Sequence, residues 1–410
     1  MLANADDARA SHFTVVLDKS CYPTDGLLAD SMQSMQLAAL VVGNDAVFSE
    51  LDFTGYTKKI GDSSKASDSH TVGKFGKGAM TAYSLSDTIQ LLSGDDVMYL
   101  DPHARILPGQ APSMRGSLVS NIRLMAEAPN QMQPFLSVTS ACPALPALTA
   151  GVHYPGTLFR LALRTAEAAQ TSKISSDAID PAQSVNSVLN KFINAAPDML
   201  LFTRSVKTIS IFVKEEADSQ AVLLHECTAT CEDMPGSVST GQIHSQLVTV
   251  RIQHGTGTAF TKKVWAVTTN VTSAGGTDGV AAALHSGPAA ATAEQYTLPG
   301  IAGRVHATMP LPFGVTALPV HVNGAFWVQS DRRKLWSGEG DRGKVSSLPH
   351  APLHDVQPVC IWCFGAVHTS CIHVLLSTAQ QLMLLSLSWP LPTTALSTVD
   401  ICHLKAALCY

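Results

Sequence analysis

Gly73-Lys74-Phe75-Gly76-Lys77-Gly78 places three glycines within six residues, after a polar loop that ends at Val72 and before a mixed helical run from Ala79. Glycine adopts positive φ angles at low cost and puts no side chain between its backbone amides and a bound group. Such a segment can close on a phosphate, because several amide hydrogens can point at the anion together. The stretch predicts a phosphate-binding loop.

Two common glycine-loop folds do not fit this stretch. A dinucleotide-binding fingerprint has the order G-x-G-x-x-G directly after a buried strand, whereas the order here is G-x-x-G-x-G and residues 61–71 before it are polar. A P-loop has lysine and a hydroxyl residue directly after its last glycine, but Gly78 is followed by Ala79-Met80. Both folds are disfavoured.

Two other segments accompany the glycine loop. Asn4-Ala5-Asp6-Asp7-Ala8 opens the chain on a helical pattern, and Asn44-Asp45 follows an apolar run over residues 37–42. An acid after a strand, a helix that carries an amide and a glycine-rich loop together indicate a nucleotide site.

Composition limits the class of protein. The chain has 410 residues, enough for two or three domains, with 46% hydrophobic and 14% charged residues. A net charge of -5 argues against a general nucleic-acid binder. The first residues include Asp6 and Asp7 and form no apolar segment of signal-peptide length, so we expect a cytoplasmic protein.

The cysteines favour neither disulfides nor a metal centre. Nine cysteines are an odd, scattered set, unlike an extracellular disulfide framework. The spacing of the Cys/His cluster near the C-terminus matches no standard zinc-ligand pattern, and the same holds for His225-Glu226-Cys227 with Cys231. That C-terminal cluster comprises Cys360, Cys363, His368, Cys371 and His373. Polar residues interrupt the apolar stretch 372–390, so we expect no membrane span there.

Helices and strands alternate through the first 165 residues, which predicts an α/β layer sandwich. The strand-like runs lie near 12–17, 38–42, 97–100 and 157–163. Asp180-Pro181 then begins an amphipathic helix that we expect to end at Pro197. The residues of this helix expected in the core are Val185, Val188, Leu189, Phe192 and Ile193.

A second region follows that helix, with alternation typical of a strand over 209–213. Residues 271–297 are rich in Gly, Ala, Ser and Thr and are expected to form a flexible insertion. Charged residues nearly vanish from about residue 348, which predicts a dissimilar, poorly ordered tail. The expected domains are 1–165, 166–347 and 348–410.

Several blocks, in this order, resemble the ATPase module of sacsin-type repeat proteins, members of the GHKL superfamily that includes DNA gyrase and large heat-shock chaperones. The blocks are LANADDARA (2–10), GNDAVFSELDFTGY (43–56), IGDSSK (60–65), GKFGKG (73–78), YLDPHARILPG (99–109), YPGTLFRLALRT (154–165) and a longer segment at 303–336. The resemblance covers roughly residues 2–213 and 300–345. It implies an α/β (α+β) fold: a two-layer Bergerat-type ATPase sandwich, with helices on one face of a mixed sheet, followed by a smaller α+β region.

The resemblance also implies a site for ATP and Mg²⁺. Asn4 would give an oxygen to the magnesium ion, the type of ligand this metal prefers, and Asp7 on the same helical face would orient its waters. Asp45 would accept a hydrogen bond from the adenine amino group, and Thr157 would help to hold the base. A lid over the phosphates would comprise Gly73, Gly76, Lys77 and Gly78.

Each of these roles has a simpler alternative. Asn4 would then cap a frayed first turn, Asp45 would end a strand in a turn, and Thr157 would be an ordinary strand residue. Lys77 stands where relatives usually have an aliphatic residue, and it either contacts a phosphate or points to solvent. Arg332 and Arg333 either reach the terminal phosphate or form a solvated basic pair.

No catalytic residue is assigned. In hydrolytic members of the superfamily a glutamate four residues before the helix asparagine acts as general base. That position falls before Met1, so we expect an N-terminally truncated domain with weak or absent hydrolysis. The sequence thus predicts an ATP-binding, chaperone-like module whose partners are adenine nucleotide and client proteins or co-chaperones, without nucleic acid or membrane. The alternative is a non-enzymatic scaffold with a degenerate pocket.

Overall fold

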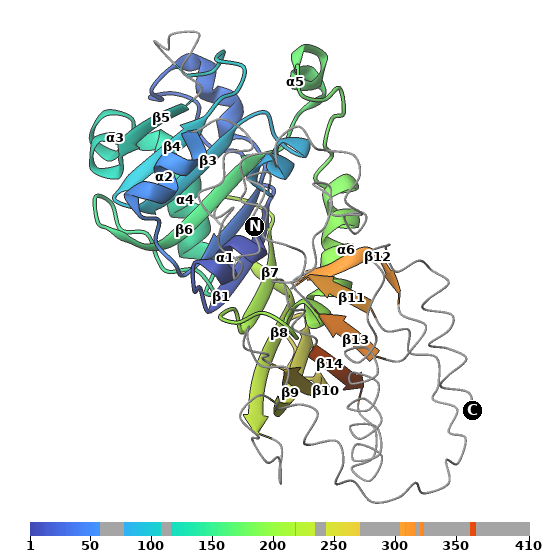
Figure 1. Cartoon of the computed structure of the whole chain (residues 1–410). Coiled ribbons are helices and arrows are strands. Elements are labelled where there is room, and N and C mark those ends of the chain that lie inside the picture. Colours follow the sequence, from blue (N-terminus) through green and yellow to red (C-terminus); the bar gives the residue numbers. More distant parts are fainter. Residues whose placement is uncertain are drawn as a thin grey trace, which may run out of the picture.

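A computed structural model describes residues 1–57, 78–107, 116–217, 219–233, 243–270, 304–307, 309–315, 320–323 and 361–365. Within these residues the strands form one mixed sheet (Figure 1). Its strand order is β12-β11-β13-β14-β10-β9-β8-β7-β1-β2-β6-β3-β4-β5. None of the described helices is long and apolar enough to cross a membrane.

The first half of the chain supplies one end of the sheet. Its strands are β1 (His12–Asp18), β2 (Ala39–Asn44), β3 (Ile89–Gly94), β4 (Asp96–Leu100), β5 (Gly116–Ser120) and β6 (Tyr154–Ala162). Its α-helices are α1 (Leu2–Asp7), α2 (Glu50–Thr57), α3 (Asn121–Glu127) and α4 (Pro129–Ala141), and its 3-10 helices are η1 (Asp30–Gln36) and η2 (Gly78–Ser84). The strands expected near 12–17, 38–42, 97–100 and 157–163 are all present.

The second half continues the same sheet. Its helices are α5 (Ala166–Thr171) and α6 (Ser184–Met199). Its strands are β7 (Thr208–Lys214), β8 (Val222–Asp233), β9 (Ile243–His254), β10 (Phe260–Asn270), β11 (Arg304–Ala307), β12 (Met309–Val315), β13 (Val320–Asn323) and β14 (Ile361–Gly365). β14 belongs to the segment expected to be a poorly ordered tail, and it pairs with β10 and β13. The insertion expected at 271–297 lies outside the described residues.

β1 joins the two halves. It pairs with β2 in antiparallel register, Val15 opposite Val42, and with β7 in parallel register, Val15 opposite Ile211. Parallel neighbours need a long crossover connection, and here nearly the whole first half lies between the two strands. One sheet therefore runs through both regions that the sequence separates at residue 165.

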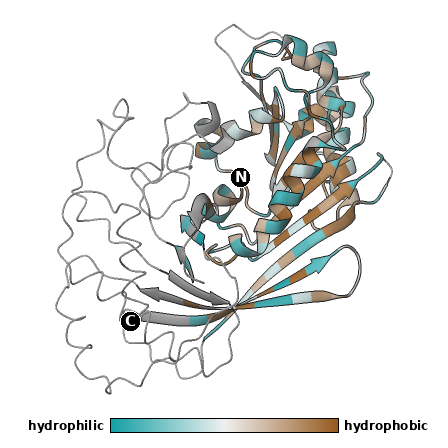
Figure 2. Ribbon diagram, turned by 90° about the vertical axis from the view of Figure 1, so that its right-hand side faces the viewer, coloured by the Kyte–Doolittle hydropathy of each residue, from teal (hydrophilic) through white to brown (hydrophobic). Residues whose placement is uncertain are grey.

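Apolar side chains bury both faces of the central strands. Val15 and Leu17 belong to one buried cluster and Val16 to another, and alternate residues of a strand point to opposite faces. We call these the α1 face, to which α1, α2, η2 and α6 contribute, and the α4 face, covered by η1, α3 and α4. Figure 2 shows the resulting hydrophobic colour on the central strands. Helices thus lie on both faces, whereas the resemblance implied one face, because apolar runs such as Val15–Leu17 leave neither face suited to water.

The amphipathic helix over 184–199 confirms the 3.6-residue pattern but corrects three details, the first being that it begins at Ser184 and not at Asp180-Pro181, because residues 181–183 form a turn. Val185 and Leu189 are buried, whereas Val188 is 46% exposed and lies outside the core. The helix continues past Pro197 to Met199. Pro197 lacks the N–H of its own position and disturbs the turn before it, but the residues after it can remain helical, and the backbone nitrogen of Leu200 donates to the carbonyl oxygen of Ala196.

Candidate nucleotide-binding site

The candidate site lies at the ends of two central strands of the sheet, where β1 begins and β2 ends. Phe13 is paired with Asn44 in the antiparallel register of these strands. The connection from α1 to β1 therefore lies beside the segment that follows Asn44. This arrangement brings Asp45 close to residues 11 and 12, directly after α1.

Asp45 is tied to the start of β1. Its carboxylate accepts hydrogen bonds from the backbone nitrogens of Ser11 at 2.8 Å and His12 at 3.1 Å, and from the Ser11 hydroxyl. The His12 Nδ1 atom lies 3.4 Å from the same carboxylate. Partial burial raises the pKa of Asp45, but the hydrogen bonds from Ser11 and His12 outweigh it, and the net effect lowers the pKa. The group is therefore an ionised acceptor at neutral pH, with 34% of its side chain exposed.

Thr157 lies directly beneath this segment. It is fully buried and pairs with Asn44 across the β2–β6 ladder. Its hydroxyl donates to the carbonyl oxygen of Ala46 at 2.7 Å and lies 2.8 Å from the Ser93 hydroxyl. The structure thus links Thr157 to the residue next to Asp45.

Ser93 is a site residue that sequence reasoning missed. Its hydroxyl oxygen accepts a hydrogen bond from the backbone nitrogen of Phe48 at 2.9 Å and lies 2.9 Å from the Gly156 carbonyl oxygen. Ser93 and Thr157 therefore hold both ends of the segment 46–48. Only the pairing of β3 with β6 brings Ser93 here, and no local sequence signal marks it.

Gly156 allows the close approach of β6 to this segment. A Cβ atom at this position would lie 2.6 Å from the carbonyl oxygen of Asn44, well inside van der Waals contact. The glycine of the YPGTLFR block is therefore needed for strand packing beside Asp45.

α1 carries Asn4 and packs on the α1 face through Leu2 and Ala5. Asn4 itself is partly buried. The Asp7 carboxylate, which the resemblance implies would orient metal-bound waters, lies 2.6 Å from Arg204 Nη2. The structure therefore gives Asp7 a partner in the second half of the chain.

The neighbouring Asp6 is more deeply engaged. It is buried and accepts hydrogen bonds from three consecutive backbone nitrogens, those of Arg204, Ser205 and Val206, at 3.2, 2.7 and 3.1 Å. Arg204 Nε also lies 3.6 Å from this carboxylate. α1 is thus attached to the segment that leads into β7. Asp6 has no predicted role apart from its place in the LANADDARA block.

Of the glycine loop, only its last residue falls within the described part of the chain. Gly78 begins η2, whereas Gly73, Gly76 and Lys77 lie outside the described residues, as do Arg332 and Arg333. η2 packs on the α1 face through Ala82 and Tyr83. The segment after the glycine loop is therefore on the same face as α1.

Buried Arg164 anchors η2. Its Nη2 donates to the Tyr83 carbonyl at 2.6 Å, its Nη1 donates to the Ser84 carbonyl at 3.2 Å, and its Nε lies 2.6 Å from an Asp87 carboxylate oxygen. Arg164 follows β6 and belongs to the block that carries Thr157, so this block holds both the segment after Asp45 and the end of η2.

Asp101 has a structural role. Its buried carboxylate accepts hydrogen bonds from the backbone nitrogens of His103, Arg105, Ile106 and Leu107, at 2.7 to 3.2 Å. The DPHARIL block is therefore a turn organised around one aspartate.

Of the cysteines and histidines considered as metal ligands, His225 and Cys227 form a pair, whereas Cys360, His368, Cys371 and His373 lie outside the described residues. His225 Nε2 lies 2.9 Å from Cys227 Sγ, and its Nδ1 lies 3.2 Å from His254 Nδ1. Burial, with a smaller contribution from His254, lowers the pKa of His225 to about 4, so this ring is neutral at neutral pH. Among the described residues no group of three such side chains is arranged to hold a metal ion.

These features define a mixed α+β protein built on a large sheet. The family model of the Sacsin domain matches residues 1–226, more than half of the chain, and the chain belongs to this family. It is 28% identical over 375 residues to human sacsin, a match that covers 84% of this chain. The chain spans only 8% of the length of that relative. The resemblance to sacsin-type proteins is therefore confirmed.

Proposed function

We propose that this chain binds ATP with Mg²⁺ at the strand ends beside Asp45, in the manner of a GHKL-type ATPase module, and serves as a chaperone-like unit. One observation carries the proposal. α1 and η2, the helices that carry Asn4 and Gly78, both pack on the α1 face of the sheet, and the ionised Asp45 follows β2, next to the segment held by Thr157. A nucleotide needs contacts for its metal, its base and its phosphates at such a place.

Asp45 is suited to recognise the base. A carboxylate has about four lone-pair sites, so hydrogen bonds from Ser11 and His12 leave capacity for an adenine amino group. Those bonds also fix its orientation, which lowers the entropic cost of binding.

Thr157 acts through the backbone in this proposal. Its hydroxyl has one hydrogen to donate, and the carbonyl oxygen of Ala46 lies 2.7 Å away as the acceptor. Together with Ser93 it holds the segment 46–48 and hence Asp45. We therefore assign Thr157 and Ser93 as positioning residues.

Asn4 would hold the metal. Mg²⁺ binds few protein oxygens and keeps several waters beside the phosphates, so one amide oxygen is an appropriate contribution. The bound ion would neutralise phosphate charge. Asp7 is paired with Arg204, and we assign it to holding α1.

Isothermal titration of the full chain with ATP and MgCl₂ tests the proposal. We expect measurable heat, with Asp45→Asn weakening the affinity at least about tenfold, roughly 1.4 kcal/mol. Asp25→Asn, at an exposed position, is the matched control and should bind as the wild type does. Absence of heat from a wild-type protein with normal circular dichroism would favour the scaffold alternative, in which Asp45 only caps the start of β1.

A further inference from the structure

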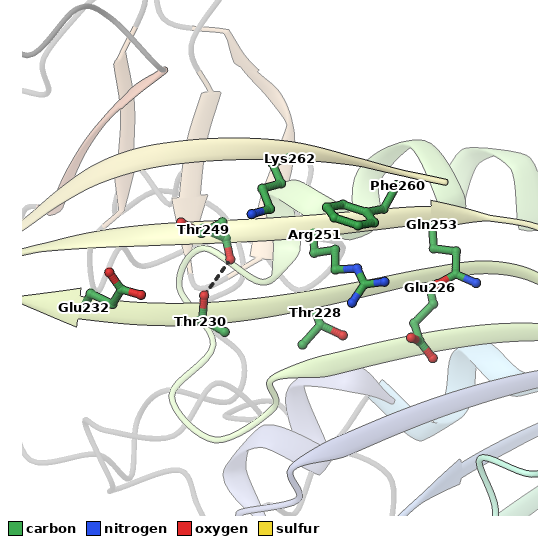
Figure 3. Close-up of a pocket in the computed structure, with 9 residues that line it drawn as sticks. All are labelled: Glu226, Thr228, Thr230, Glu232, Thr249, Arg251, Gln253, Phe260 and Lys262. Carbon is green, nitrogen blue, oxygen red and sulfur yellow. Dashed lines mark hydrogen bonds between the residues drawn. The ribbon is translucent and has the colours of Figure 1, made fainter. Parts of the chain in front are cut away.

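A groove of about 400 Å³ lies on the outer face of β8, β9 and β10, formed by side chains at alternate positions of these three strands (Figure 3). Their other face is buried, with Cys227, Val250 and Trp265 in the core. This pattern fixes which side chains point outward. Figure 2 shows hydrophilic and hydrophobic positions alternating along these long strands.

Two cations occupy neighbouring positions in the groove. Arg251 and Lys262 are directly opposite each other in the β9–β10 register, and both are exposed. Like charges at such a pair of positions repel. Neither forms an ion pair with another residue in the described part of the chain. An anion bound between them would remove this repulsion.

The Phe260 ring lies within cation–π distance of both cations. The Arg251 guanidinium carbon lies 4.1 Å from the centre of the Phe260 ring, and Lys262 Nζ lies 5.6 Å from it. The ring is nevertheless 45% exposed. Cation–π contacts of this kind orient the charged groups and leave an apolar surface beside them.

Acidic side chains limit the groove at both ends. Thr228 is the β8 residue opposite Arg251. Glu226 lies two residues before Thr228 along β8, and Glu232 lies four residues after it. At about 3.3 Å per residue, the two glutamates lie about 7 Å and 13 Å from the cations along the strand. A long polyanion such as nucleic acid would meet these carboxylates. A segment with a single acidic residue flanked by basic residues would place positive charges, not negative ones, beside both glutamates.

We propose that this groove binds an extended segment of a partner protein that carries one acidic residue over Arg251 and Lys262 and basic residues over the two glutamates. Arginine binds a carboxylate through two parallel hydrogen bonds, and the lysine adds a second charge. In an extended segment the residues at spacings of two and four share a face with the acid. The matching patterns are Lys-x-Glu-x-x-x-Lys and its reverse, because the bound segment can run parallel or antiparallel to β8.

Fluorescence anisotropy with labelled nine-residue peptides tests this assignment. The probes carry each pattern in a Ser/Ala background and are titrated with the full chain without nucleotide. We expect one of them to bind, and its Glu→Gln version to bind at least about tenfold more weakly. The double variant Arg251→Glu with Lys262→Glu should cause a similar loss. Lys191→Glu, an exposed lysine on α6, is the matched control and should change nothing.

Three results would overturn the proposal: no binding of either peptide at about 1 mM protein, equal binding of the Glu and Gln peptides, or a single-stranded oligonucleotide that binds more tightly than the peptides and is lost in the double variant. Circular dichroism should confirm that the double variant is folded, since both positions are exposed. Asp45→Asn should leave peptide binding unchanged, so this result is independent of the proposed nucleotide site.

Discussion

The buried carboxylate of Asp6 lies 2.7 Å from the backbone nitrogen of Ser205, although 199 residues separate them in the chain. The helix that carries Asn4 is therefore held on the segment that leads into β7. β7 in turn continues into β8 and the groove around Arg251. The metal that we propose to bind at Asn4 would therefore contact a helix that is attached to the second half of the sheet.

Asp6→Ala is expected to lower the free energy of unfolding by about 3 kcal/mol. The substitution leaves the amides of Arg204, Ser205 and Val206 without their acceptor, and an unsatisfied buried donor costs about 1–3 kcal/mol. Urea denaturation followed by circular dichroism measures this change. Asp25→Ala, at an exposed position, is the control, and an equal effect of both variants would contradict the role of Asp6.

Ser93→Ala is expected to weaken ATP binding about fivefold, roughly 1 kcal/mol, because the backbone nitrogen of Phe48 loses its acceptor and segment 46–48 loosens. Stability should fall by about 1 kcal/mol. Titration calorimetry and urea denaturation give the two values. Ser93→Thr should restore part of the affinity, whereas Ser140→Ala, on an exposed turn of α4, should match the wild type. Unchanged affinity in Ser93→Ala would refute the positioning role.

Gly156→Ala is expected to destabilise the fold by about 2 kcal/mol, since the new methyl group would overlap the Asn44 carbonyl oxygen and force the strands apart. Thermal unfolding should show a lower Tm. Gly257→Ala is the matched control, because the nearest atom to its added Cβ is 4.0 Å away. Equal Tm values for the two variants would mean that β2 and β6 separate without cost.

The low pKa of Asp45 predicts an acid-dependent loss of stability. A carboxyl whose folded pKa lies below its unfolded value, ordinarily near 4, stabilises the fold above the unfolded pKa, and this contribution disappears as pH falls through the folded pKa. Unfolding free energies measured by urea between about pH 6 and pH 3 should therefore fall more steeply for the wild type than for Asp45→Asn. Parallel curves would show that the bonds from Ser11 and His12 do not favour the ionised form.

Much of the local structure could be predicted from sequence. The apolar run Val15–Leu17 marks a strand, and the spacing of Val185 and Leu189 marks α6, because both signals depend on neighbours within one element. Val188 shows the limit of the pattern: the period places it near the apolar stripe, but only the packed neighbours decide whether a residue at the margin is covered. The helix also ends at Met199 rather than at Pro197, because a hydrogen bond from the Leu200 nitrogen to the Ala196 carbonyl oxygen forms beyond the proline, and the residue pattern does not show this bond.

From the amino-acid sequence one could predict the family, the strands near 12–17, 38–42, 97–100 and 157–163, and the candidate residues Asn4, Asp45, Gly78 and Thr157. Tertiary structure decided the partners: Ser205 for Asp6, Phe48 for Ser93, and Lys262 facing Arg251. It also placed β7 beside β1 and helices on both faces of the sheet. The reason is physical, since hydrogen bonds and charge contacts between distant segments depend on strand register, and register is set collectively by packing of both sheet faces.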